Sequence, residues 1–295
     1  MMLIDKGVKY FRNLLLFGAM LLLGACYPSE ELNVPEKEDE TEYTELDEYI
    51  NDNFVEKYGM VVRYRYRDDF LAPGQRAIPV DVEYVRPMLD FLEKFWIAPF
   101  LSVENGEEFF LNHVPAEIVL LGGPVFEGST QVLGLAEAGA SVTLLDVNEI
   151  DLEDEEWVYR QLNIIYHEFA HVVHQRYKLP SGFETISPTG YTGPGSWYVL
   201  DDNDALERGF VTPYATSQVT EDFAELVSFY TFDPEFQEKY IDQEDDCNDP
   251  ECELRNEGKN KISQKLASVA NHYEKVTGVS LENLRNELQS VLEGE

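Results

Sequence analysis

The chain has 295 residues, of which 44% are hydrophobic, and 57 acidic residues against 22 Lys and Arg give a formal net charge of −35 at pH 7. This acidic excess argues against nucleic acid and anionic lipid headgroups as partners, because both carry negative charge themselves. The length is enough for one large domain or two small ones.

The first residues have the features of a bacterial lipoprotein signal. Three basic residues precede an apolar run over residues 14–23, which is too short for a confident membrane span and is typical of a signal peptide. The run ends in Leu-Gly-Ala-Cys, which resembles a lipobox, so we expect residues 1–25 to be removed and Cys26 to be lipidated. The alternative is an ordinary signal peptide with an incidental cysteine.

The residues after Cys26 indicate where the protein goes. Ser29, Glu30 and Glu31 resemble an acidic export signal, so we expect an outer-membrane, lipid-anchored protein at the cell surface, with the periplasmic face as the alternative. Residues 26–42 contain many acidic and few apolar residues, which predicts a lipidated, disordered tether.

The next part of the chain predicts a mixture of helices and strands. Hydrophobic periodicity predicts helices over residues 44–56 and 80–95, and strands over residues 60–66 and 116–122. Residues 132–136 and 141–147 are expected to form a hairpin around Gly139.

Residues 155–178 predict a long helix, because apolar residues recur at helical spacing and neither Gly nor Pro occurs before Pro180. This helix carries the run His167-Glu168-Phe169-Ala170-His171. Residues four apart lie on one face of a helix, so both imidazoles can reach one metal ion.

This run predicts metal-assisted hydrolysis, most often of a peptide bond. Zinc binds imidazole nitrogen readily, and a catalytic zinc site combines three protein ligands with a water molecule. Glu168 lies beside the first histidine and can take a proton from that water. The alternative, two histidines buried in the core, is disfavoured because burying them with a glutamate unpaired would be costly.

Two further groups on the predicted helices could complete the site. His174 lies about 10 Å along the helix axis from His167, so we expect it to have a structural or supporting role rather than to bind the same metal. Residues 217–232 predict a second helix, on which Glu221 and Glu225 lie one turn apart. One can bind the metal while the other orients a ligand imidazole. A solvated acidic face remains the alternative.

The motif His167-Glu-Phe-Ala-His171, followed by Tyr214, Glu221 and Glu225, resembles the gluzincin metallopeptidases related to anthrax lethal factor, over residues 160–230. The resemblance implies that Glu221 is the third zinc ligand and that Tyr214 supports the transition-state oxyanion. It also implies that Glu225 does not bind the metal but orients a residue that does. The metzincin pattern fails, because His174 and Tyr177 occupy the positions of its Gly and third His.

The lipoprotein start, the size and the sequence His174-Gln175 after the motif also resemble zinc metallohydrolase lipoproteins of Bacteroidetes-type bacteria, associated with TonB-dependent import. This resemblance implies an outer-membrane importer complex as a partner.

Strands followed by helices predict an α+β fold for residues 43–295, a zincin-like domain in which a small twisted sheet packs on the metal-binding helix. In this fold, strand 141–147 is expected to form the edge to which an extended peptide adds. Residues 179–198, rich in Gly, Pro and aromatic residues, are expected to form a cleft wall or lid, or alternatively a packed surface loop.

Cys247 and Cys252 lie in an acidic loop, residues 242–253. In an oxidising compartment a local disulfide is expected. The carboxylates of the loop could instead hold calcium, although no Gly stands where an EF-hand loop needs one.

The sequence therefore predicts a metallopeptidase with one Zn²⁺ per chain, a peptide or protein substrate and a membrane anchor at Cys26. One alternative is a non-catalytic surface binding lipoprotein of an importer complex that retains zinc, and another is an amidase or deacetylase that acts on a glycan or cell-wall peptide. The presence of both Glu168 and Tyr214 favours an enzyme over a binding protein.

Overall fold

The structure is a computed structural model that describes residues 43–67, 71–127, 130–132, 136–137, 141–245, 247 and 250–294. Residues 44–295 form one compact unit. The expected signal peptide, the lipidated Cys26 and the tether lie outside the described residues. Within the described part of the chain, no helix is both long and apolar enough to cross a bilayer.

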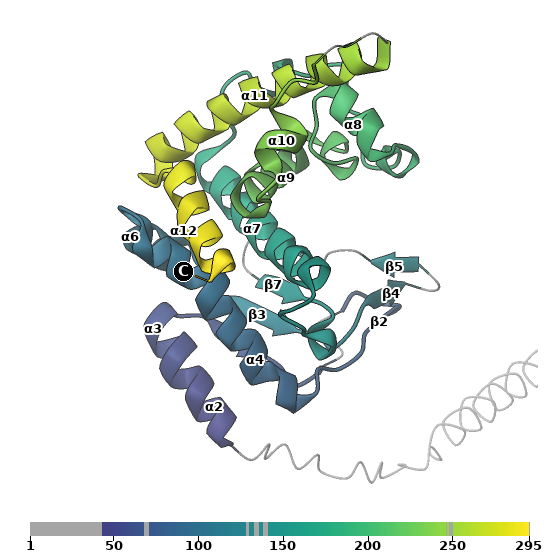
Figure 1. Ribbon diagram of the computed structural model, residues 1–295. Coiled ribbons are helices and arrows are strands. Elements are labelled where there is room, and N and C mark those ends of the chain that lie inside the picture. The colour runs from purple at the N-terminus through teal and green to yellow at the C-terminus, as the bar shows by residue number, and fades with distance from the viewer. Residues whose placement is uncertain are drawn as a thin grey trace, which may run out of the picture. The chain divides into compact units, whose positions relative to one another are not determined.

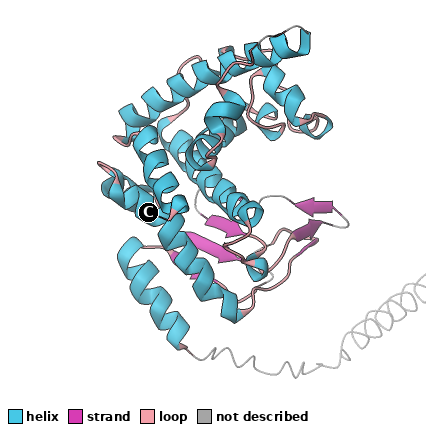
Figure 2. Ribbon diagram, viewed as in Figure 1, coloured by secondary structure: helices cyan, strands magenta, loops and turns pink. Residues whose placement is uncertain are grey.

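Helices make up most of this unit (Figures 1 and 2). The α-helices are α2 (Glu45–Ile50), α3 (Glu56–Tyr58), α4 (Val82–Leu92), α5 (Ala98–Ser102), α6 (Gly106–His113), α7 (Glu155–Tyr177), α8 (Asp202–Arg208), α9 (Val219–Phe232), α10 (Phe236–Tyr240), α11 (Pro250–Thr277) and α12 (Leu281–Glu293). The strands are β1 (Val61–Arg63), β2 (Gln75–Arg76), β3 (Glu117–Leu120), β4 (Val125–Glu127), β5 (Thr130–Val132), β6 (Ala136–Glu137) and β7 (Ser141–Leu144).

The two predicted N-terminal helices are confirmed, and each contains a π-helical turn. In the first, Asn51–Val55 joins α2 to α3, and in the second, Glu93–Ile97 joins α4 to α5. The Thr44 side chain accepts a hydrogen bond from the Asp47 backbone N–H, which satisfies a donor at the start of α2. The sequence pattern could not show the π turns, because they change the hydrogen bonding and leave the apolar periodicity almost intact.

The strands form two small sheets. The larger has the order β1-β3-β7-β6, in which β1, β3 and β7 are parallel and β6 is antiparallel. The smaller is antiparallel, with the order β2-β4-β5.

Two expectations about the strands are wrong. Ala136 and Glu137 pair with β7 as the predicted hairpin requires, but Val132 belongs to β5 in the other sheet. Gly139 lies outside the described residues. In addition, β7 is not an edge strand, because it pairs with β3 on one side and β6 on the other, so β6 forms this edge of the sheet. The error arose because an interior strand and an edge strand have the same hydrophobic pattern when both are buried.

Helix α7 packs against β7, and two side chains of the helix bind the backbone just after this strand. Gln161 Nε2 donates to the carbonyl oxygen of Leu145 at 2.9 Å, and Trp157 Nε1 donates to that of Asp146 at 3.0 Å. Further along α7, Phe169 is 2% exposed and packs edge-on against Trp96 and Phe100. One face of α7 therefore belongs to the hydrophobic core.

The C-terminal half is helical, and α9 packs along α7 (Figure 1). Ser228 Oγ donates to the backbone oxygen of Asn163 at 3.1 Å, which links the two helices. Helix α12 covers α9, and α11 lies against α8. At that contact a Cβ on Gly258 would lie 1.7 Å from the carbonyl oxygen of Leu206, so only glycine allows the two helices to approach so closely.

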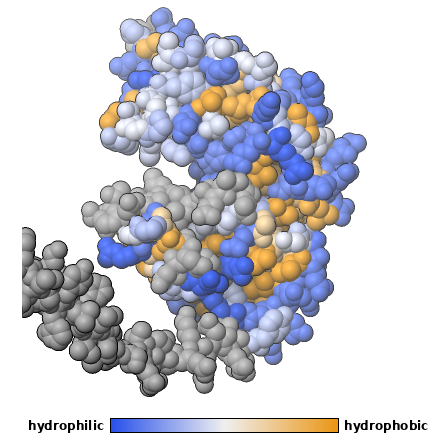
Figure 3. Space-filling view, turned by 180° about the vertical axis from the view of Figure 1, so that it is seen from behind, coloured by the Kyte–Doolittle hydropathy of each residue, from blue (hydrophilic) through white to orange (hydrophobic). Residues whose placement is uncertain are grey.

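The predicted α+β class is therefore confirmed, with small sheets and a mostly helical C-terminal half. The predicted disulfide is confirmed as well, because Cys247 is bonded to Cys252 immediately before and within the start of α11. Calcium binding stays a prediction, since residues 246, 248 and 249 of the loop lie outside the described residues. Seen from behind, the surface is mostly hydrophilic with separate hydrophobic patches (Figure 3).

Candidate metal centre

Helix α7 carries both histidines of the motif on the face opposite Phe169. Asp154 caps the helix by accepting hydrogen bonds from the backbone N–H groups of Glu156 and Trp157. The helix is continuous to Tyr177, so His167 and His171 lie one turn apart, with their Nε2 atoms 3.0 Å from each other. His167 is 7% exposed and His171 is half-buried.

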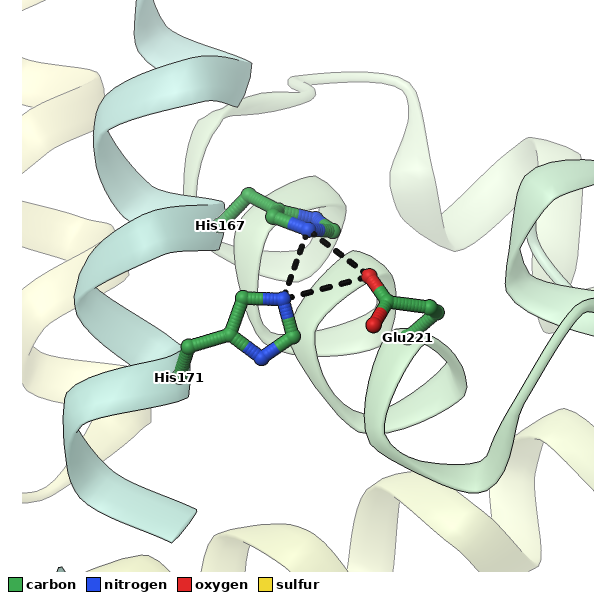
Figure 4. Close-up of side chains that lie close together, drawn as sticks. All are labelled: His167, His171 and Glu221. Carbon is green, nitrogen blue, oxygen red and sulfur yellow. Dashed lines mark hydrogen bonds and ion pairs between the residues drawn. The ribbon is translucent and has the colours of Figure 1, made fainter. Parts of the chain in front are cut away.

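Helix α9 adds a carboxylate to this pair. Glu221 lies in its first turn, and its Oε2 atom is 3.2 Å from His167 Nε2 and 3.1 Å from His171 Nε2. The three side chains point toward one another across the α7–α9 contact (Figure 4). Within the described residues, these three form the one group of His, Cys, Asp and Glu whose ligand atoms could hold a metal ion.

The donor set fits zinc. Imidazole nitrogen and carboxylate oxygen are both zinc ligands at about 2.0–2.2 Å, and tetrahedral geometry then places ligand atoms about 3.3 Å from each other. The three distances, 3.0 to 3.2 Å, are close to that value. Three protein ligands also leave a fourth position for water or substrate, as in catalytic rather than structural zinc sites.

Glu225 supports His167 from the other side of its ring. Its Oε1 atom lies 2.7 Å from His167 Nδ1, and its Oε2 atom accepts a hydrogen bond from Thr212 Oγ1 at 2.7 Å. With Nδ1 held by a carboxylate, the lone pair of Nε2 faces the Glu221 side and is available to a cation. Glu225 is 4% exposed, so it is not part of a solvated acidic face.

His174 contacts the Nδ1 atom of His171, as Glu225 contacts the Nδ1 atom of His167. Its Nε2 atom lies 2.7 Å from His171 Nδ1, while its ring packs edge-on against Phe223. Burial and the nearby His171 lower the pKa of His174 to about 4. A neutral His174 can accept a hydrogen bond from His171, which leaves the Nε2 atom of His171 free to bind a cation.

Tyr214 and Glu168 lie at the same site. Tyr214 belongs to the 3₁₀ turn Tyr214–Thr216 just before α9, is 38% exposed, and has its ring centroid 6.0 Å from that of His167. Burial and a hydrogen bond with Glu221 raise its pKa above the ordinary tyrosine value, so it is a hydroxyl donor at neutral pH. Burial also raises the pKa of Glu168, and the charges of His167 and His171 oppose this shift.

The electrostatics favour a cation between these groups. Burial alone would lower the pKa of His167, but hydrogen bonds with Glu221 and Glu225 raise it to about 10. Burial also opposes ionisation of Glu221, but hydrogen bonds with His167 and His171 hold the pKa of this carboxyl well below its usual range. The surroundings therefore stabilise positive charge where a metal ion would lie.

Two features of the surroundings of the site could not be expected from the sequence. Thr212 carries no motif, although it holds Glu225 in place. Next to Glu221 in the chain, the Asp222 carboxylate is 1% exposed, pairs with Lys265 Nζ at 2.8 Å and accepts a hydrogen bond from Tyr191 at 2.7 Å. Asp222 follows Glu221 in an acidic sequence, so no sequence signal distinguished a buried carboxylate from an exposed one.

Comparisons with known proteins agree with this geometry. Residues 38–282 match the family described as "putative zinc-binding metallo-peptidase". Among solved structures, the chain is similar to one described as a "putative zinc-binding metallo-peptidase" from Bacteroides caccae ATCC 43185. The two share 28% identity with a TM-score of 0.67, over 83% of this chain and 90% of that chain. No curated protein matches the chain.

Proposed function

We propose that this chain, which belongs to the family of putative zinc-binding metallo-peptidases, hydrolyses peptide bonds in a gluzincin-type site where His167, His171 and Glu221 hold one zinc ion. The observation that carries this proposal is the triangle of ligand atoms at 3.0 to 3.2 Å. Two further observations support it: Glu168 interacts electrostatically with both histidines, and Tyr214 with Glu221, so they are the candidates for the base and the hydroxyl donor.

The side chains divide the chemistry between them. A zinc ion bound there would lower the pKa of its water toward neutrality and polarise the substrate carbonyl. Glu168 takes the proton of the attacking water and passes it to the leaving amine. Tyr214 donates its hydroxyl hydrogen to the developing oxyanion. Glu225 and His174 hold the two imidazoles in orientation.

We also propose that the protein acts at the bacterial outer membrane, anchored by lipid at Cys26 and exposed at the cell surface, with an importer complex as a partner. The sequence Leu-Gly-Ala-Cys at residues 23–26 supports the anchor, and the acidic residues after it support export to the surface. Replacing Cys26 by Ala in cells should abolish lipid labelling and release the protein from the membrane fraction. Labelling that persists would contradict the anchor.

Metal content and peptide cleavage test the catalytic proposal together. Residues 27–295 of the wild type, Glu221→Ala and Glu168→Gln would be analysed for zinc per chain, and each would be assayed on a mixture of peptides. We expect about one zinc in the wild type and in Glu168→Gln, little in Glu221→Ala, and cleavage by the wild type alone. Cleavage by Glu168→Gln at the wild-type rate would contradict the assignment of the base.

The same measurements separate the peptidase from the alternatives. Full zinc retention by Glu221→Ala would move the third ligand to another residue. Stoichiometric zinc without hydrolysis of any peptide would favour the binding lipoprotein, or an amidase that acts on a glycan or cell-wall peptide.

A further inference from the structure

A row of aromatic rings leads from a metal-ligand histidine to the surface. The ring centroid of Tyr214 is 6.0 Å from that of His167 and 5.2 Å from that of Trp197. The ring of Trp197 is in turn 6.2 Å from that of Tyr198. Trp197 and Tyr198 belong to the 3₁₀ turn Trp197–Val199, which contacts the turn that carries Tyr214.

The outer end of this row is exposed to solvent, and a second exposed hydrophobic residue follows it. Tyr198 is 67% exposed and Val199 is 69% exposed. Single exposed hydrophobic residues are normal on protein surfaces and carry no argument alone. Here two of them are adjacent, and Tyr198 continues the row of ring contacts that runs through Trp197 and Tyr214 to His167.

The turn is fixed rather than loosely attached. Thr192 N donates to the carbonyl oxygen of Thr216 at 2.8 Å, and the hydroxyl oxygens of these two threonines lie 2.9 Å apart. The backbone N–H of Leu200 closes the turn by donating to the carbonyl oxygen of Trp197 at 3.1 Å. The segment before the turn is therefore tied to Tyr214–Thr216 at Thr192, and the ring contact of Trp197 with Tyr214 places the turn itself beside the site.

We propose that the turn Trp197–Val199 is a substrate-recognition subsite, which binds a hydrophobic side chain of the peptide a few residues from the bond that is cleaved. This inference rests on the proposed peptidase function. Three steps between ring centroids, of 6.0, 5.2 and 6.2 Å, separate His167 from Tyr198. An extended peptide advances about 3.3 Å per residue, so a chain that lies across the metal centre reaches the turn within roughly five residues. Aromatic and aliphatic side chains gain most from covering exposed tyrosine and valine surface.

The two halves of the segment 179–198 differ in their surroundings. Phe183 is fully buried and Tyr191 is tied to Asp222, so that half is packed against the protein. The other half ends in the exposed turn beside Tyr214. The segment thus combines a packed half with an exposed turn next to Tyr214.

The test compares two matched double variants with the wild type. Tyr198→Ala/Val199→Ala removes the exposed side chains without altering Tyr214 or a metal ligand. Val82→Ala/Leu152→Ala removes two hydrophobic side chains that are 62% and 57% exposed elsewhere on the molecule. Zinc content and melting temperature would verify that both variants fold and bind the metal. Each protein would then cleave a peptide mixture, with cleavage positions mapped by mass spectrometry.

In the wild type we expect a preference for aromatic or large aliphatic residues at one position near the cleaved bond. Tyr198→Ala/Val199→Ala should lose about tenfold in kcat/KM on those peptides and little on peptides with Gly or Ser at that position. The surface control should behave as the wild type. Affinities of the same peptides for each variant in a Glu168→Gln background provide a second readout that needs no turnover.

The failures are distinguishable. Cleavage by the wild type without a hydrophobic preference, or with a preference that survives in Tyr198→Ala/Val199→Ala, would overturn the subsite and leave the peptidase proposal intact. A protein that binds zinc but neither cleaves nor binds any of the peptides would overturn the proposed function and the subsite with it.

Discussion

Glu225 Oε1 lies 2.7 Å from His167 Nδ1, on the opposite side of the imidazole from Nε2, which faces Glu221. The two carboxylates, one helical turn apart on α9, thus hold one histidine of α7 between them. The ring cannot rotate without breaking a buried contact, so the direction of its metal-binding nitrogen is set by α9.

Glu225→Gln should weaken zinc binding about 10- to 100-fold, because an amide orients the ring less strongly and does not enhance its basicity as a carboxylate does. Competition with a chelator of known affinity would measure the change. Thr212→Val, which removes the hydroxyl that holds Glu225, should show a smaller loss of affinity. Glu238→Gln, on the exposed surface of α10, is the matched control. Equal zinc affinity in Glu225→Gln and the control would contradict the supporting role.

Tyr214→Phe should lower kcat about 10²- to 10³-fold, as expected for the loss of one oxyanion donor, while KM and zinc content change little. Steady-state kinetics on a cleaved peptide would measure this. Tyr66→Phe is the control, because it removes a hydroxyl from a tyrosine that is 36% exposed, as Tyr214 is 38% exposed, and that belongs to neither the metal centre nor the proposed subsite. A loss that appears in KM instead of kcat would indicate that Tyr214 binds the substrate and does not stabilise the transition state.

Lys265→Met should destabilise the metal-free protein by about 3–5 kcal/mol at pH 8, because it leaves the Asp222 carboxylate buried without its cation. Burial already raises the pKa of Asp222 to about 6, against the effect of Lys265. Without the lysine that pKa rises further.

The sign of the pH dependence follows from this shift. The pKa of Asp222 is higher in the folded than in the unfolded chain, so the folded state binds the proton more tightly, and stability falls as pH rises through that window. Lys265→Met should therefore cost less stability at pH 5 than at pH 8, and denaturant unfolding at both pH values would measure the difference. The double variant Asp222→Asn/Lys265→Met should lose much less stability at pH 8, and a pH-independent loss in the single variant would contradict the explanation.

Zinc should raise the melting temperature by about 5–10 °C at a hundredfold excess over its dissociation constant, because binding to the folded state alone adds about 2.7 kcal/mol. Thermal melts with and without a chelator would test this. Glu221→Ala should show little of the shift. An equal shift in that variant would place the stabilising zinc elsewhere.

The sequence was informative where side-chain spacing alone determines geometry. Because residues four apart share a helix face, the pairing of His167 with His171 and of Glu221 with Glu225 could be expected once α7 and α9 were predicted. How the two helices approach each other depends on long-range packing, such as the contact of Ser228 with Asn163, and spacing contains no information about it. The resemblance to a known family, not the spacing, singled out Glu221 over Glu225.

Other features could not be read from the sequence because they depend on partners far along the chain. Nothing in the sequence around Lys265 distinguishes it from an exposed helical lysine, yet it is 1% exposed and pairs with Asp222, the residue after Glu221. Similarly, β7 is an interior strand because β6 pairs with its outer side, and the sequence of β7 does not show this pairing. Residues 1–42 lie outside the described residues, so the signal peptide, Cys26 and the tether stay predictions.

The metal ligands lie on α7 and α9, two helices that also pack on each other in the hydrophobic core. Unlike a zinc finger, whose folding requires the ion, this architecture can form first and acquire its metal afterwards. A preformed His-His-Glu triangle fits zinc, but the affinity of such a site for divalent first-row metals follows a general order in which copper binds more tightly than zinc. Occupancy by zinc should therefore depend on the metals available in the compartment where folding is completed, as well as on the ligands of the site.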